Sequence, residues 1–206
     1  AILLAIRFVP QYGLSRGIFY SVFHAVSAFC NAGFDLMGHQ QPYNSLSGYY
    51  DDWLVNLVIM SLIVIGGVGF IVWDDLSRNK LHVRKYLLQT KIVLILTTVL
   101  VFGGAGLFYL LEKDNLMADM SISGKILTSL FSSVTARTAG FNPIDTGALT
   151  DGSKFLTIIL MFIGGSPGST AGGVKTTTIA VLLLYVHASI QRTYGVNIMG
   201  RRLEDD

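Results

Sequence analysis

The stretch VFHAVSAFCNAGFD, residues 22–35, recurs in altered form as LFSSVTARTAGFN, residues 130–142, once a gap of one residue is allowed. The segment that follows each copy recurs as well, since LIVIGG at 62–67 aligns with LMFIGG at 160–165. Repetition of two successive segments in the same order indicates two copies of one structural unit. Each unit is predicted to consist of a helix, a short half-helix, the sequence Ala-Gly-Phe-Asp or Ala-Gly-Phe-Asn, and a second helix.

The composition is that of an integral membrane protein. The 206 residues are 51% hydrophobic and only 14% charged, with a mean hydropathy of +0.56, whereas about a quarter of the residues of a soluble domain are charged. The net charge of +2 is too small to indicate a nucleic-acid partner, and the single Cys30 excludes an internal disulfide framework and a cysteine-based zinc site. We therefore predict a membrane protein that binds no nucleic acid.

Two segments have the length of complete membrane spans. Residues 53–73 carry no charge and have a Trp at each end, where aromatic residues meet the membrane interface, and residues 92–111 are uncharged throughout. The opening AILLAIRFVP has neither an initiator Met nor the basic region of a signal peptide. We interpret it as the end of a transmembrane helix whose start is missing, so the chain is expected to be a piece of a longer protein.

A third membrane segment, residues 154–186, is interrupted in its middle. Two apolar halves, 155–163 and 179–186, flank a stretch of Gly, Ser and Thr with one Pro and one Lys. Each half is shorter than the about 20 residues that span a bilayer. Because proline removes a backbone donor and glycine lowers the cost of reorganising a segment, the helix is predicted to break at residues 164–167.

The distribution of Lys and Arg predicts the orientation in the membrane. Residues 74–91 contain five of them and the tail 187–206 contains three, so both segments are expected on the cytoplasmic side. The loop 36–52 contains none and is expected outside. Residues 112–125 must then face outside too.

Two apolar stretches between these spans, 17–30 and 126–136, are too short to cross the membrane. The predicted orientation requires that each of them enters and leaves on the outer side, as a re-entrant half-helix. Irregular backbone at that depth is tolerated only where protein buries it or where it lines an aqueous path.

The Ala-Gly-Phe sequences after the half-helices are such irregular backbone. Glycine adopts dihedral angles that aim consecutive carbonyls in one direction, and a stack of carbonyls can replace the hydration shell of a cation. The half-helix also points its negative C-terminal end toward the membrane interior, which stabilises a cation there by about 1 kcal/mol. Each unit is therefore predicted to supply part of a cation pore, and the chain is not expected to be an enzyme.

These motifs together resemble one family. The sequences NAGFD (31–35) and TAGFN (138–142), the opening RFVPQYG and above all MFIGGSPGSTAGGVKTTT (161–178) are similar to the Trk/Ktr/HKT superfamily of potassium transporters, in particular its KtrB membrane subunits. The resemblance covers essentially the whole chain. It implies an all-α integral membrane fold in which four pseudo-repeats of a potassium-channel-like M1, pore helix and M2 surround one axis. This chain would contain the second and third repeats.

The resemblance also implies boundaries for these repeats. The second repeat is expected over 1–73, with a truncated M1, a pore helix at 17–30, a filter at 31–35 and M2 at 53–73. A cytoplasmic linker, 74–91, leads to the third repeat over 92–186, with M1 at 92–111, a pore helix at 123–136, a filter at 138–142 and M2 at 154–186, interrupted by an intramembrane gating loop at 164–174. The cytoplasmic tail is 187–206.

By the same resemblance, backbone carbonyls of both filters bind potassium, and no other metal is expected. The residues concerned are Asn31, Ala32, Gly33 and Phe34 in the first filter and Thr138, Ala139, Gly140 and Phe141 in the second. The alternative is that the glycines only make tight turns. The two phenylalanines are more readily explained as packing that braces the filter than as ligands.

Two polar residues lie near the filters. Packing explains His24 better than metal binding does, since no His, Cys or acid follows it three or four residues on. Arg137 needs a partner at this depth, and a structural brace to an acid or a carbonyl is favoured over direct contact with ions.

The interrupted third segment would form the gate. The residues assigned to it are Gly164, Gly165, Ser166, Pro167, Gly168, Ser169, Thr170, Ala171, Gly172, Gly173 and Lys175. In the family this loop obstructs the ion path below the filter and moves on activation, and small side chains fit a segment with two conformations of similar energy. The alternative is a loop that only relieves packing.

Lys175 is expected to face the aqueous cavity or a cluster of carbonyls, because a buried ammonium at this depth is unfavourable. There it either repels a cation in the closed state or simply caps loop carbonyls. The stretch around it, residues 168–176, is not a phosphate-binding loop, because Val174 separates Gly173 from the lysine.

The function that the resemblance implies is potassium uptake across the cell membrane, a bacterial plasma membrane. The alternative is a membrane scaffold or sensor that keeps the fold without transporting, although the duplicated filter favours transport. The implied partners are the lipid bilayer, a second copy in a homodimer, and a cytosolic ring of nucleotide-binding, KtrA-like RCK regulatory subunits. Nucleotide is expected only on that ring, and this chain is expected to need no cofactor besides the potassium ion it transports.

Overall fold

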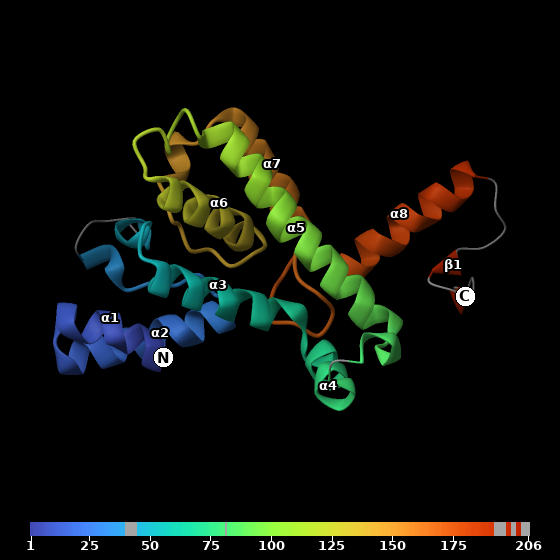
Figure 1. Cartoon of the computed structure of the whole chain (residues 1–206), viewed down its shortest axis with the longest axis horizontal. Coiled ribbons are helices and arrows are strands. Elements are labelled where there is room, and N and C mark those ends of the chain that lie inside the picture. The colour runs from blue at the N-terminus through green and yellow to red at the C-terminus, as the bar shows by residue number, and fades with distance from the viewer. Residues whose placement is uncertain (40–44, 81, 192–196, 199–200, 203–206) are drawn as a thin grey trace.

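The structure is a computed structural model that describes residues 1–39, 45–80, 82–191, 197–198 and 201–202. Its architecture is helical (Figure 1), as predicted. The α-helices are α1 (Ile2–Tyr12), α2 (Leu14–Phe29), α3 (Trp53–Val68), α4 (Phe70–Asn79), α5 (Leu88–Glu112), α6 (Ile122–Ala136), α7 (Asp151–Phe162) and α8 (Thr176–Ile190). Short 3₁₀ turns and an antiparallel ribbon of β1 (Asn197–Ile198) and β2 (Arg201–Arg202) complete the described elements.

The two predicted units follow one another as α1, α2, α3 and α5, α6, α7, with α2 and α6 in the places of the predicted pore helices. Small residues let each pore helix approach the helix before it, as in other membrane helix pairs. A Cβ on Gly17 of α2 would lie 2.5 Å from Val9 Cα of α1. A Cβ on Gly104 of α5 would lie 2.3 Å from Ser133 Oγ of α6, and this hydroxyl donates to Val101 O at 2.8 Å.

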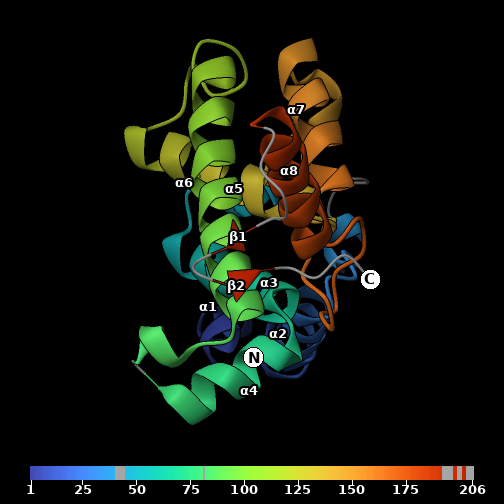
Figure 2. The ribbon, with the colours of Figure 1, turned by 90° about the vertical axis from the view of Figure 1, so that its right-hand side faces the viewer.

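The span predicted over residues 53–73 is wrong as a single helix. α3 ends at Val68, Gly69 has a φ of +96°, and α4 is bent by 93° relative to α3. Glycine adopts a positive φ without strain, and such a residue ends a helix. The N–H of Phe70 donates at 2.9 Å to the carbonyl of Gly168, far along the chain. In Figure 2, α4 lies across the lower end of the molecule while α5 runs upright.

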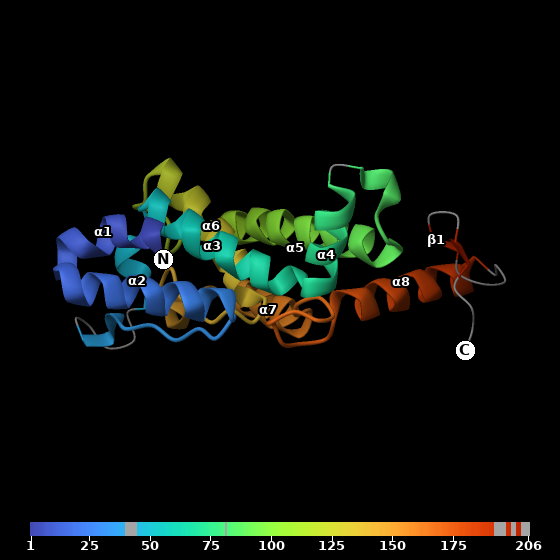
Figure 3. The same cartoon turned by 90° about the horizontal axis from the view of Figure 1, so that it is seen from below.

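One helix among the described residues, α5, is long and apolar enough to cross a bilayer, and the bent pair of α3 and α4 would be a second if it counts as one span. The interrupted segment 154–186 forms α7 and α8, of 12 and 15 residues, each too short to span alone. α8 projects away from the rest of the molecule (Figures 1 and 3). The predicted tail 187–206 begins inside α8, and most of it lies outside the described residues.

The break between α7 and α8 begins one residue earlier than predicted. α7 ends at Phe162, where Ile163 leaves the helix to pair with Val174. The N–H of Gly164 then donates to Val174 O at 3.1 Å. Pro167 comes after the helix has already ended, so the expectation that it breaks the helix is corrected: pairing between the two limbs of the loop replaces the helical hydrogen bonds.

Loops predicted on the outer side meet at one end of the molecule. The N–H of Leu46 donates to Asn142 O at 3.1 Å. Glu112 Oε1 accepts from both the N–H and the hydroxyl of Thr150, at 2.9 and 2.7 Å. The basic linker 74–91 lies at the opposite end of α5 (Figure 1). This separation is what the predicted topology requires.

Candidate functional site

Each pore helix ends in a loop whose backbone is left-handed at two matching positions. In the first filter loop, residues 31–35, φ is +51° at Asn31 and +72° at Gly33. In the second filter loop, residues 138–142, φ is +65° at Thr138 and +86° at Gly140. The alanine between the two left-handed residues has no positive φ in either loop. When left-handed and right-handed backbone conformations alternate from one residue to the next, consecutive carbonyls can face the same direction.

Hydroxyl groups in the last turn of each pore helix hold both loops in the same way. Ser27 Oγ donates to the carbonyl of Phe34 at 2.7 Å, and Thr135 Oγ1 donates to the carbonyl of Phe141 at 2.6 Å. The main-chain oxygens of the same two hydroxyl residues accept from the alanine N–H of the filter loop, at 2.9 and 3.0 Å. These equivalent bonds place the one-residue gap of the sequence alignment between the helix hydroxyl and the filter.

Three carbonyls in each filter loop, those before the phenylalanine, accept no hydrogen bond from any residue that the structure describes. They belong to Asn31, Ala32, Gly33, Thr138, Ala139 and Gly140. The side-chain oxygen Oδ1 of Asn31 is buried and likewise has no partner in the described part of the chain. Oxygen atoms without a protein donor are available to a cation, as in the filters of cation channels.

The two filter loops touch at their glycines. A Cβ on Gly33 would lie 2.7 Å from Ala139 O and 2.8 Å from the Cα of Gly140. Both glycines also have a positive φ, which other residues adopt only with strain. The close contact and the dihedral angle therefore require glycine independently of one another.

The phenylalanines of the two loops have different surroundings. Phe141 is fully buried, with its ring 6.5 Å from that of His24 on α2, whereas Phe34 is 70% exposed. His24 also accepts from the N–H of Leu36 at 3.3 Å and has its Nδ1 2.7 Å from Tyr20 O. The histidine thus packs against the second filter loop and braces the first one.

The chain between α7 and α8, residues 163–175, reaches the base of both filter loops. Thr170 Oγ1 accepts from Asn31 Nδ2 at 2.8 Å and donates, also at 2.8 Å, to the carbonyl of the last residue of α2. The N–H of Gly172 donates to Thr138 Oγ1 at 3.0 Å. The loop therefore contacts the first left-handed residue of each filter.

Hydrogen bonds within this loop hold its two limbs together. The N–H of Gly165 donates to Gly172 O at 3.0 Å, and a Cβ on Gly164 would lie only 1.8 Å from the same oxygen. Lys175 Nζ donates to Ala171 O at 2.8 Å. Of the roles considered for this lysine, the contact matches the capping of a loop carbonyl.

The same loop also holds the break between α3 and α4. The N–H of Ser166 donates to Gly67 O at 3.0 Å, and that of Thr170 donates to Gly66 O at 3.2 Å. These oxygens belong to the last turn of α3, where carbonyls lack helical partners. The loop thus connects the filter bases with the start of α4.

Arg137, at the end of α6, is only 4% exposed. Its Nε has no hydrogen-bond partner among the residues that the structure describes. The brace that we expected from the sequence is therefore not seen at this atom within the described ranges.

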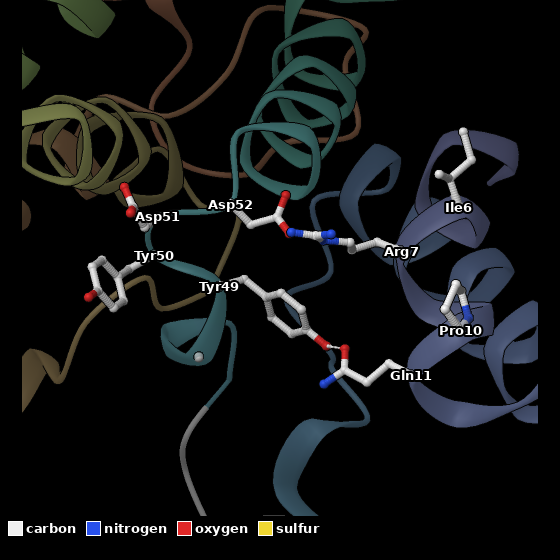
Figure 4. Close-up of a pocket in the computed structure, with 9 residues that line it drawn as sticks. Ile6, Arg7, Pro10, Gln11, Tyr49, Tyr50, Asp51 and Asp52 are labelled. Carbon is white, nitrogen blue, oxygen red and sulfur yellow. Dashed lines mark hydrogen bonds and ion pairs between the residues drawn. The ribbon is translucent and has the colours of Figure 1, made fainter.

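A polar pocket of about 620 Å³ lies between α1 and the turn before α3 (Figure 4). Arg7 forms an ion pair with Asp52 there, and the hydroxyl of Tyr49 donates to Gln11 Oε1 at 2.5 Å. Burial, with the Tyr12 hydroxyl beside it, raises the pKa of Tyr49, so this hydroxyl stays protonated. The pairing of these groups fastens α1 to the loop before α3.

Comparison with known proteins shows the family to which this chain belongs. The TrkH family, described as cation transport protein, matches residues 2–206. The chain belongs to the TrkH family. It is 40% identical over 204 residues to the potassium/sodium uptake protein NtpJ of Enterococcus hirae, and 43% identical over 193 residues to the Ktr system potassium uptake protein B of Bacillus subtilis. The solved structure of the potassium transporter TrkH from Vibrio parahaemolyticus matches 98% of this chain and 50% of its own, with a TM-score of 0.68 and 20% identity, a likeness of fold.

This TrkH-family chain spans less than half of the curated relatives it matches: the alignments cover 98% of the chain and 44% of NtpJ, and 93% of the chain and 42% of the Bacillus subtilis protein. Membership confirms the resemblance stated from the sequence and places the chain in a membrane. The relatives are transporters rather than enzymes.

The hydroxyl side chains that hold the two filter loops were not predicted from the sequence. Ser27 and Thr135 align in the repeated stretch, so a hydroxyl kept in both copies was the available signal. Thr170 had no such signal, because its partner Asn31 is 139 residues away along the chain.

Proposed function

We propose that this TrkH-family chain forms part of a pore that takes up potassium across the cell membrane. The observation that carries the proposal is the duplicated filter loop, with alternating backbone hand and six carbonyls that accept no hydrogen bond from the described residues. Such carbonyls can replace the water around a cation. The name of the Ktr relative supports potassium as the ion, while that of NtpJ includes sodium as well.

Two filter loops cover only part of the coordination shell of an ion. A dehydrated cation in a filter is surrounded by carbonyls on all sides of the pore axis. The pore we propose therefore contains further units of the same fold, arranged with these two around one axis.

A flux assay on the complete transporter tests this function. We expect reconstituted liposomes to accumulate rubidium, and potassium to inhibit that uptake at lower concentration than sodium. Liposomes without protein are the control. If correctly folded protein carries neither rubidium nor sodium, the scaffold or sensor alternative is supported instead.

The loop between α7 and α8 is the gate in this proposal. It is held against the base of the filters by few bonds, those of Thr170 and Gly172, each of which contributes about 1 kcal/mol. A regulator with a modest difference in affinity for two states can shift such an equilibrium. The small side chains of the loop let it adopt a second position.

We further propose that the transporter is a homodimer in a bacterial plasma membrane and carries a cytosolic ring of nucleotide-binding subunits. The Bacillus subtilis relative is named as a protein of the Ktr system, which supports a partner protein. Arg84 and Lys85 in the linker 74–91 are exposed and follow α4, which contacts the start of α5. They offer a basic surface at the end of α5 away from the filters.

Reversing both charges, in Arg84→Glu with Lys85→Glu, is expected to weaken binding of the cytosolic ring by about tenfold at low salt, because charge pairs at an interface guide association. The effect should shrink at high salt, where exposed charges are screened. Co-purification and a titration of the ring measure it. The matched control, Lys113→Glu with Lys154→Glu, makes the same charge change at the opposite end of the molecule. If the ring still binds after reversal and after removal of residues 201–206, it docks elsewhere.

A further inference from the structure

A cavity of about 460 Å³ lies beside the second filter loop. It is formed by α5, α6, α7 and the chain that follows the filter. Its lining includes Ser132, Ala136, Ile144, Thr157 and Met161. We call this cavity the open seat.

The internal repeat gives each of these residues an equivalent in the first unit. The two aligned stretches match Ser132 with His24 and Ala136 with Ala28, and Ile144 and Met37 each lie four residues after the filter glycine. The alignment of LIVIGG with LMFIGG, extended backwards, matches Met161 with Ile63 and Thr157 with Ile59.

In the first unit the equivalent place is filled. Ala28, Met37, Ile59 and Ile63 belong to one buried cluster that also contains Phe141. The ring of His24 lies 6.5 Å from that of Phe141, as noted for the site. The occupant of the first seat is thus the side chain that follows the filter glycine of the second unit.

In the described part of the chain, the first unit lacks a packing site for its own phenylalanine. Phe34 is the equivalent of Phe141, yet it is 70% exposed and packs into no such seat among the residues that the structure describes. The packing of Phe141 in the first unit therefore joins the two units. The second unit keeps the open seat, and the first unit keeps an exposed phenylalanine, Phe34.

We propose that the open seat receives the apolar side chain that follows the filter glycine of a further pore unit, and that Phe34 enters the equivalent seat of the unit on its other side. The proposal rests on the proposed function, since it assumes a ring of pore units around one axis. Each filter loop is then clamped by the pore helix of its neighbour. The open seat adjoins Thr138 and Gly140, so its occupant also supports the filter backbone.

Disulfide trapping in the complete transporter tests the contact. In a Cys30→Ser background, Ser132→Cys is combined with a cysteine that replaces the residue after the filter glycine of the adjoining unit. The positive control is His24→Cys with Phe141→Cys, which joins the same two positions within this chain. We expect both pairs to close under mild oxidation to a similar extent. Mobility on a denaturing gel reveals whether the adjoining unit belongs to the same polypeptide or to a second copy.

A matched pair of bulky variants separates occupation of the seat from general effects on folding. Thr157→Trp fills the open seat and should lower the yield of the Ser132 disulfide several-fold. Ile158→Trp, on the neighbouring exposed position of α7, should leave that yield unchanged.

The inference is overturned if the control pair closes and the Ser132 pair does not, an outcome that leaves a lipid chain as the occupant. Trapping does not measure transport. A protein that forms the disulfide but carries no cation contradicts only the proposed function, while selective uptake without the disulfide contradicts only the seat.

Discussion

Replacing Gly33 or Gly140 by alanine in the complete transporter is expected to lower its preference for potassium over sodium by about tenfold or more. Both residues have a positive φ, which is unfavourable for an alanine by roughly 1–2 kcal/mol. The new methyl group at position 33 would also lie 2.7 Å from Ala139 O. The loop can relieve both strains only by turning its peptide groups, and this misaligns the carbonyls.

The measurement is rubidium uptake into liposomes with potassium or sodium as competitor. Gly106→Ala is the matched control, because a Cβ at this position on α5 meets no atom within 4 Å and alanine is a better helix former than glycine. This variant should keep the wild-type selectivity. Should both filter variants discriminate as the wild type does, these glycines only make turns, and the ion ligands lie elsewhere.

The sequence predicted the two repeated helical units because their signal is local and occurs twice. The aligned stretches placed the ends of α2 and α6 within a few residues, and the glycines at matching positions both have left-handed dihedral angles. Hydrophobic length alone also found α5. These features depend on residues that are neighbours along the chain.

The bend between α3 and α4 could not be predicted from neighbouring residues in the sequence. Residues 53–73 are uncharged and apolar enough for a continuous span, and Gly69 is one of several glycines in that stretch. The bend depends on hydrogen bonds from a distant loop, such as that between Phe70 and Gly168. A pattern of hydrophobic residues contains no information about such partners.

The different surroundings of Phe34 and Phe141 were equally hidden. Both residues occupy the same place in the repeated sequence, and nothing local distinguishes them. Their exposure differs because Phe141 packs against His24 of the helix α2, whereas Phe34 has no such helix beside it in the described part of the chain. Equivalence in sequence therefore predicts equivalent contacts only where the neighbouring unit is present.

Deleting Ser169–Gly173 from the complete transporter is expected to raise ion flux and to make it less dependent on the cytosolic partner. The deletion removes Thr170 and Gly172, whose bonds hold the loop against the first residue of each filter and the end of α2. Three such bonds contribute about 1 kcal/mol each. Their loss would shift the balance between closed and open loop by about two orders of magnitude if they are made only in the closed state.

A point variant gives the same test with less change to the chain. Thr170→Val keeps the shape of the side chain and removes both hydrogen bonds of its hydroxyl, so flux without the partner should rise by about tenfold or somewhat more. Thr178→Val, at an exposed position on α8, is the matched control and should leave flux unchanged. Flux into liposomes is measured with and without the partner for every variant.

The size of the two effects decides between a gate and a packing element. A gate responds in proportion to the bonds removed, so the deletion should exceed Thr170→Val, and both should narrow the difference between flux with and without the partner. A loop that only fills space would respond differently. Its deletion would remove the bond from the Thr170 N–H to Gly66 O, weaken the packing where α3 meets α4, and reduce the amount of folded protein. If the deletion folds normally while flux stays low and fully dependent on the partner, the loop is not the gate, and its irregular backbone serves the packing of α3 and α4 alone.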